Sequence, residues 1–136
     1  MRFVLDSSVL IAWAFDEQSV YADAVGGSLA ENEALVPSPW PSEFSNTLLV
    51  AERRGRMSAA ESARLRDHVL GLPIEVVGDH PQHIMTEVLA LARQHGLTVY
   101  DASYLDLAMR EGVPLASLDA DLVAAAKRVG VPLVEA

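Results

Sequence analysis

The stretch RFVLDSSVLIAWAF, residues 2–15, sets the fold, because a short apolar strand passes almost directly into a helix. The run RFVL contains the branched and aromatic residues that are typical of a buried strand. The segment from Val9 to Phe15 is expected to be helical, with Ser7 and Ser8 as capping candidates. A strand followed at once by a helix is the unit from which parallel sheets are built.

The same alternation of strand and helix continues along the chain. Further strands are predicted at residues 34–36 (ALV), 74–77 (IEVV), 114–117 (PLAS) and 131–135 (VPLVE). Helices are predicted over residues 19–31, from the loop PSPWP to Gly55, from Ser58 to about residue 70, and over residues 81–94, 101–111 and 119–129. We therefore expect an α/β fold with three layers, α/β/α, and a central parallel sheet covered on both faces. The whole chain, residues 1–136, is expected to form a single domain.

Composition and charge limit the classes of function. The chain has 136 residues, of which 51% are hydrophobic, and a formal net charge of −9. Its longest apolar run, residues 9–15, is far shorter than the roughly 20 residues of a membrane span, so no membrane contact is expected. Met1 leads directly into a strand without room for a signal peptide, which predicts a cytoplasmic protein. The absence of cysteine excludes disulfides, thiolate zinc sites and cysteine nucleophiles.

The acidic charge also argues against nucleic-acid binding through a broad basic surface. It leaves open a site in which divalent cations neutralise the charge, or in which a few arginines are placed locally. An acidic excess further favours a basic protein partner.

Three aspartates fall where ligand sites form in α/β sheets, near the carboxyl ends of strands or at the adjoining helix starts. Asp6 directly follows the first strand, while Asp101 and Asp119 follow LTVY and PLASL and open predicted helices. Glu43 lies in the first turn of the helix after PSPWP, with Asn46 one turn later on the same face. Each acid taken alone is also typical of a helix cap or of a residue that the helix dipole favours. The joint pattern favours a shared site.

Converging carboxylates need a compensating cation. Two such charges about 4 Å apart repel by roughly 4 kcal/mol at an effective dielectric constant of about 20. Oxygen ligands without cysteine or a well-placed pair of histidines indicate Mg²⁺ or Mn²⁺ rather than zinc. Metal ions held by carboxylates can orient a water and lower its pKa, which is the chemistry that hydrolyses phosphodiesters.

Four motifs in order resemble those of a known family. They are VLDSSVL, WPSEFSNTLL, LTVYDASYLDLA and LASLDADL. Together they resemble the PIN domain, specifically the VapC-type toxins of type II toxin–antitoxin systems, from residue 2 to about residue 133. The resemblance implies a Mg²⁺- or Mn²⁺-dependent endoribonuclease that acts on RNA, is inhibited by a cognate antitoxin and is usually a homodimer. It also implies an acidic quartet that binds metal and activates water, made of Asp6, Glu43, Asp101 and Asp119.

The resemblance assigns supporting roles to three more residues. Ser117 matches the small hydroxyl residue commonly found two positions before the last acid of the quartet. Asn46 matches a polar position beside the acidic helix start, and Asp121 is an acid that could replace or assist Asp119.

The densest basic patch is ERRGR, which contains Arg53, Arg54 and Arg56. Arginine suits phosphate contacts, so these three side chains are RNA-binding candidates. The alternative is that they lie at a helix C-terminus because the helix dipole favours basic residues there.

Other polar residues have a more ordinary interpretation. Asp106 lies about 140° round the helix from Asp101 and is expected on a solvated face. The histidines of HPQH, His80 and His83, are typical of surface or capping residues. Tyr104, one turn after Asp101, is expected to pack in the core, with a possible contact to the cleft.

Two alternatives to a metal-dependent nuclease remain open at this point. An aspartate-nucleophile phosphatase of the haloacid dehalogenase type would need an aspartate two residues after Asp6, where this chain has Ser8. A non-catalytic PIN-like binding module would use the same acids to hold a structural ion or a basic peptide.

Overall fold

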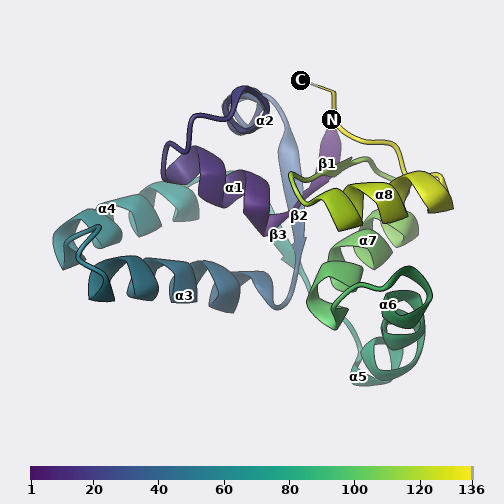
Figure 1. Cartoon of the computed structure of the whole chain (residues 1–136). Helices are drawn as coiled ribbons and strands as arrows, with labels where there is room; N and C mark the ends of the chain where they lie inside the picture. Colours follow the sequence, from purple (N-terminus) through teal and green to yellow (C-terminus); the bar gives the residue numbers. More distant parts are fainter. Residues whose placement is uncertain (136) are drawn as a thin grey trace.

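The computed structural model describes residues 1–135 and has a central parallel sheet flanked by helices (Figure 1). The strands are β1 (Arg2–Leu5), β2 (Glu33–Pro37), β3 (Ile74–Val77) and β4 (Leu115–Ala116). Their order in the sheet is β3-β2-β1-β4, and every neighbouring pair is parallel. The predicted α/β class with a parallel sheet is confirmed.

Helices cover both faces of this sheet. They are α1 (Ser7–Ala14), α2 (Val20–Ser28), α3 (Trp40–Arg53), α4 (Ala59–Leu70), α5 (Pro81–His83), the π-helical turn η1 (Ile84–Val88), α6 (Leu89–His95), α7 (Val99–Glu111) and α8 (Ala120–Val129). In Figure 1, α1 to α4 lie on one side of the strands and α5 to α8 on the other, which gives the three expected layers. No helix within residues 1–135 is long and apolar enough to cross a membrane.

The helix boundaries follow local sequence signals. Ser58 and Glu61 form the predicted capping box, in which each side chain accepts a hydrogen bond from the backbone N–H of the other residue. The helix predicted over residues 81–94 has the expected extent, but η1 separates its first turn, α5, from α6. In a π-helix each hydrogen bond spans five residues instead of the four of an α-helix. Such segments are rare, and they often lie at functional sites.

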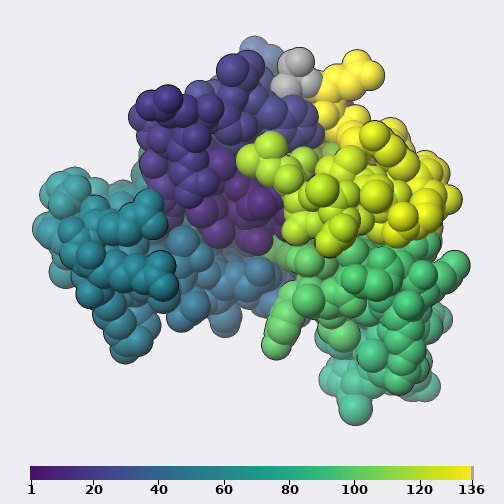
Figure 2. Space-filling view, viewed as in Figure 1, coloured from purple at the N-terminus to yellow at the C-terminus, as the bar shows by residue number. Residues whose placement is uncertain are grey.

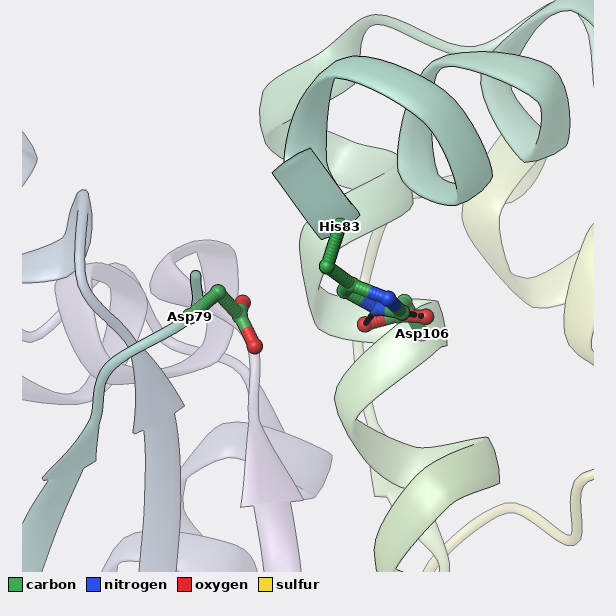
Figure 3. A group of neighbouring side chains, drawn as sticks. All are labelled: Asp79, His83 and Asp106. Carbon is green, nitrogen blue, oxygen red and sulfur yellow. Dashed lines mark hydrogen bonds and ion pairs between the residues drawn. The ribbon is translucent and has the colours of Figure 1, made fainter. Parts of the chain in front are cut away.

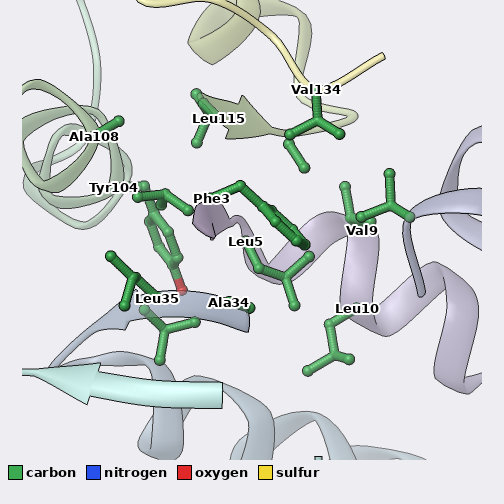
Figure 4. Packing of buried hydrophobic residues seen from close by; sticks show 14 of the residues in the cluster. Phe3, Leu5, Val9, Leu10, Ala34, Leu35, Tyr104, Ala108, Leu115 and Val134 are labelled. Atoms are coloured by element: carbon green, nitrogen blue, oxygen red, sulfur yellow. The ribbon is translucent and has the colours of Figure 1, made fainter. Parts of the chain in front are cut away.

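The core lies around β1 and fixes the position of α7. Phe3 and Leu5 of β1 pack with residues of α1, including Val9 and Leu10, and with Tyr104 of α7 (Figure 4). The segment from residue 102 to residue 108 is buried throughout. This apolar contact holds the start of α7 against the sheet, close to the carboxyl ends of the strands.

The predicted closing strand at residues 131–135 is wrong. This segment makes one isolated parallel bridge, between Leu115 and Leu133, and adds no strand to the sheet. The reason is local, because β4 has only two residues and Pro132 has no N–H to donate. Residue 136, the last of the predicted domain, lies outside the described residues.

Candidate active site

Asp6 lies at the end of β1, directly before α1, and is 3% exposed. It occupies the N-cap position of α1, but its side chain makes no capping hydrogen bond. Instead, its Oδ2 accepts hydrogen bonds from the Ser8 hydroxyl at 2.6 Å and from the Ser117 hydroxyl at 2.8 Å. The capping interpretation is therefore wrong for Asp6, whose carboxylate faces the loop after β4.

Ser117 joins the ends of two adjacent strands. Its hydroxyl donates to Asp6 and accepts from the backbone N–H of Asp119 at 3.0 Å. Asp119 in turn is the N-cap of α8, where its Oδ1 accepts from the N–H of Leu122 at 3.0 Å. The capping interpretation is thus correct for Asp119, and the cap fixes its carboxylate beside Asp6.

Glu43 lies in the first turn of α3 and is partly exposed. The hydroxyl of Tyr104 donates a hydrogen bond of 3.0 Å to its Oε1. A longer contact of 3.5 Å joins the Ser7 hydroxyl to Oε2. Tyr104 is fully buried, so it both packs in the core and contacts the site.

Asp101 is the third residue of α7 and is partly exposed. The helix starts at Val99, two residues earlier than predicted, and its cap is Thr98. The Thr98 hydroxyl accepts from the Asp101 N–H at 3.1 Å. Asp101 is therefore not the cap of this helix.

Burial and neighbouring charges shift the pKa values of Asp6 and Asp101. Burial, followed by the charges of Asp119 and Glu43, raises the pKa of Asp6, although the hydrogen bonds from Ser8 and Ser117 oppose the shift. Burial and the charges of Asp6 and Asp119 likewise raise the pKa of Asp101. Carboxylate groups that lie near one another and offer only oxygen donors are a set that fits a hard divalent cation.

Asp6 and Asp119 thus lie at the carboxyl edge of the sheet, directly before α1 and α8, and Glu43 of α3 and Asp101 of α7 are near them. In Figure 2, the purple N-terminal segment, the blue start of α3, the green α7 and the yellow-green segment before α8 adjoin one another on one face. Asp121, in the first turn of α8, is exposed, and its charge also raises the pKa of Asp101. Asn46 is exposed one turn beyond Glu43.

The basic residues are not brought to this group. Arg53 ends α3, Arg54 follows it, and Arg56 lies in the turn before α4. All three are exposed. Because a helix rises about 1.5 Å per residue, Arg53 lies roughly 15 Å along the axis from Glu43.

A second cluster was missed by the sequence reasoning. Asp79, His83 and Asp106 each offer a ligand atom, and these atoms lie within 4.8 Å of one another. Within the described residues, no three acids of the quartet meet that distance. Figure 3 shows His83 of α5 facing Asp106 of α7, with Asp79 on the loop after β3.

Arg110 makes this second cluster an ion-pair network. Its guanidinium contacts Asp79 through Nη2 and Asp106 through Nε, at 2.8 Å for the latter. Asp106 is 7% exposed, so the predicted solvated face is wrong for it. The hydrogen bond to Asp106 raises the pKa of His83, and the charges of Asp106 and Glu87 act in the same direction. His80 has the predicted capping role, since its Nδ1 accepts from the N–H of Gln82.

Comparison with known proteins identifies the family. The chain matches the PIN domain over residues 3–128. This chain belongs to the PIN domain family. The resemblance inferred from the four motifs is confirmed.

Several known proteins are similar over most of the chain. Ribonuclease VapC3 of Pyrobaculum aerophilum is 28% identical over 123 residues, which are 90% of this chain and 92% of the relative. A crystal structure of the protein PAE2754, from the same organism, has a TM-score of 0.72 at 28% identity, covering 92% of this chain and 79% of the other. VapBC2 of Rickettsia felis, bound to a DNA fragment from its promoter, has a TM-score of 0.67 at 14% identity, covering 99% and 98%. At that identity the last similarity concerns the fold alone.

Proposed function

We propose that this PIN domain protein is a Mg²⁺- or Mn²⁺-dependent endoribonuclease that acts as the toxin of a type II toxin–antitoxin pair. The observation that carries the proposal is the grouping of Asp6, Glu43, Asp101 and Asp119 at one edge of the sheet. There Ser117 links Asp6 to Asp119, and Tyr104 of α7, the helix of Asp101, links to Glu43. The name of the relative Ribonuclease VapC3 supports RNA as the substrate.

Each residue of the site would have a defined role in holding the metal or the attacking water. Asp6, Asp101 and Asp119 would hold the metal, while Glu43 would complete the set of ligands or hold the attacking water. Ser117 would keep the Asp6 carboxylate oriented, and Asn46 and Asp121 would border the site. A bound Mg²⁺ or Mn²⁺ lowers the pKa of water and offsets charge on the phosphate. Attack by water on the phosphodiester leaves a 5′-phosphate and a 3′-hydroxyl.

The same proposal includes the partners. A cognate antitoxin would inhibit the enzyme in the cytoplasm, and two copies of the chain would form a homodimer. Solved toxin–antitoxin complexes of similar fold, such as VapBC2 of Rickettsia felis, support an antitoxin partner. Arg53, Arg54 and Arg56 would contact RNA phosphates away from the reacting bond.

The test is cleavage of RNA by the purified chain in the presence of Mn²⁺, with and without EDTA. Asp101→Asn removes one acid of the quartet without removing a helix cap, and it should abolish cleavage. Asp23→Asn changes an exposed aspartate of α2 and is the matched control, which should cleave like the wild type. An Asp101→Asn protein that still cleaves RNA, or cleavage that EDTA does not affect, would contradict the proposal.

A further inference from the structure

We propose that Tyr104 is a positioning residue for Glu43, whose carboxylate it orients by donating a hydrogen bond to Oε1. The inference rests on the proposed function, because it gives the fixed carboxylate a part in binding the metal. It adds to the acidic quartet a residue that would not contact metal or RNA.

The burial of the tyrosine makes it a rigid donor. Tyr104 is 0% exposed and is among the largest fully buried side chains of the protein. Its ring packs among Phe3 and Leu35, so the position of its hydroxyl is fixed by the core (Figure 4). Glu43, by contrast, is partly exposed on the first turn of α3, where a glutamate side chain has several rotamers of similar energy.

The direction of the hydrogen bond is set by chemistry. An ionised carboxylate only accepts, so the Tyr104 hydroxyl donates to Oε1 at 3.0 Å. A hydrogen bond to a charged group is stronger than a neutral one, and it occupies one of the two oxygens. Among residues 1–135, Oε2 has only the long contact from Ser7, at 3.5 Å, and remains available to a metal.

The placement of Tyr104 on α7 couples two acids of the site. Asp101 and Tyr104 are three residues apart and lie on neighbouring positions of one helix face. The hydrogen bond joins residues that are 61 positions apart, from α3 and α7. Tyr104 therefore links the Glu43 carboxylate of α3 to α7, the helix that carries Asp101.

The test removes the hydroxyl and keeps the ring. Tyr104→Phe should fold like the wild type, with Mn²⁺ binding weaker by about 10- to 100-fold when it is titrated by calorimetry without RNA. Tyr21→Phe is the matched control, since it removes another tyrosine hydroxyl, one that donates to the backbone of Val134 at 2.8 Å. The control should leave Mn²⁺ affinity unchanged.

A double-mutant cycle with Glu43→Gln separates positioning from a general effect on the core. If Tyr104 acts through Glu43, then adding Tyr104→Phe to Glu43→Gln should weaken Mn²⁺ binding no further. Unchanged affinity in Tyr104→Phe, or an equal loss in both backgrounds, would overturn the inference. The Asp101→Asn variant distinguishes failure of this inference from failure of the proposed function. If the proposed function is correct, Asp101→Asn should lose Mn²⁺ binding whatever the role of Tyr104.

Discussion

The Ser117 hydroxyl donates a 2.8 Å hydrogen bond to Oδ2 of Asp6, across 111 positions of the chain. The two residues follow β4 and β1, which are neighbouring strands of the sheet. Both are buried, and the backbone N–H of Asp6 also donates to the carbonyl of Ala116. The topology of the sheet thus places a polar pair at the centre of the acidic group.

Removal of the Ser117 hydroxyl should weaken both the fold and the site. Ser117→Ala leaves the Asp119 N–H without its partner and takes one donor from Asp6, at a cost of about 1–3 kcal/mol in the free energy of unfolding. Mn²⁺ binding should weaken by about tenfold or more, because the orientation of Asp6 is less fixed. Urea unfolding and calorimetry measure the two effects. Ser117→Thr keeps the hydroxyl and is the control; equal Mn²⁺ affinity in the alanine and threonine variants would contradict this prediction.

Asp119 has two roles that substitutions can separate. Asn is as good an N-cap as Asp, so Asp119→Asn should keep α8 intact while it removes one charge from the site. Asp119→Ala should also lose the cap to Leu122 and cost about 1 kcal/mol of stability. We expect both variants to lose Mn²⁺ binding and cleavage, and only the alanine variant to unfold at lower urea. An asparagine variant that cleaves RNA would limit Asp119 to its capping role.

Much of the fold follows from local signals in the sequence. The apolar run at residues 2–5 and its change to a helical pattern predict β1 and α1, and Asp6 is placed at the edge of the sheet by its position alone. The order of strands and helices then brings Asp119 to the same edge, since parallel strands share their carboxyl ends. Within residues 1–135, no strand directly precedes Asp101, which lies in α7. These steps need only periodicity, turn residues and the handedness of the connections.

Other features depend on contacts between distant segments. The spacing of Asp106 from Asp101 places it on a different face of the helix, where a polar residue is expected to be solvated. Its burial depends on two ion-pair partners, Arg110 and His83. The hydrogen bond from Tyr104 to Glu43 joins α7 and α3. No local sequence pattern defines the distance between these two helices. The segment at residues 131–135 has the composition of a strand, but the short β4 beside it gives it little to pair with.

Metal binding should release protons at mildly acidic pH. Burial and like charges raise the pKa values of Asp6 and Asp101 above their ordinary value of 3.8, so Mn²⁺ must displace protons there as the pH falls. In the metal-free protein, the raised pKa values make the folded state less stable at pH values above them. This loss of stability decreases as the pH falls through the raised pKa values toward 3.8. Mn²⁺ should therefore raise the Tm more at pH 7 than at pH 5.

Calorimetry in buffers of different ionisation enthalpy measures the protons released. We expect more protons released at pH 5 than at pH 7, because the carboxyl groups are more fully ionised at pH 7. Equal proton release at the two pH values, together with an equal rise in Tm, would contradict this prediction.

Asp106→Asn distinguishes the two groups of potential metal ligands. Arg110 already supplies a positive charge to Asp79 and Asp106, so a second cation at this network would be repelled. We expect Asp106→Asn to lower the free energy of unfolding by about 1–3 kcal/mol, since the change weakens buried hydrogen bonds to a charged group.

Mn²⁺ affinity in Asp106→Asn should equal that of the wild type, whereas Asp101→Asn should lose it. Both substitutions are on α7 and both remove one negative charge, which makes them a matched pair. Their opposite effects on metal binding, with the loss of stability in Asp106→Asn, would assign Asp106 to the packing of α5 against α7 and Asp101 to the active site. If Mn²⁺ binding is instead lost in Asp106→Asn and kept in Asp101→Asn, the ion binds at the network of Asp79, His83 and Asp106.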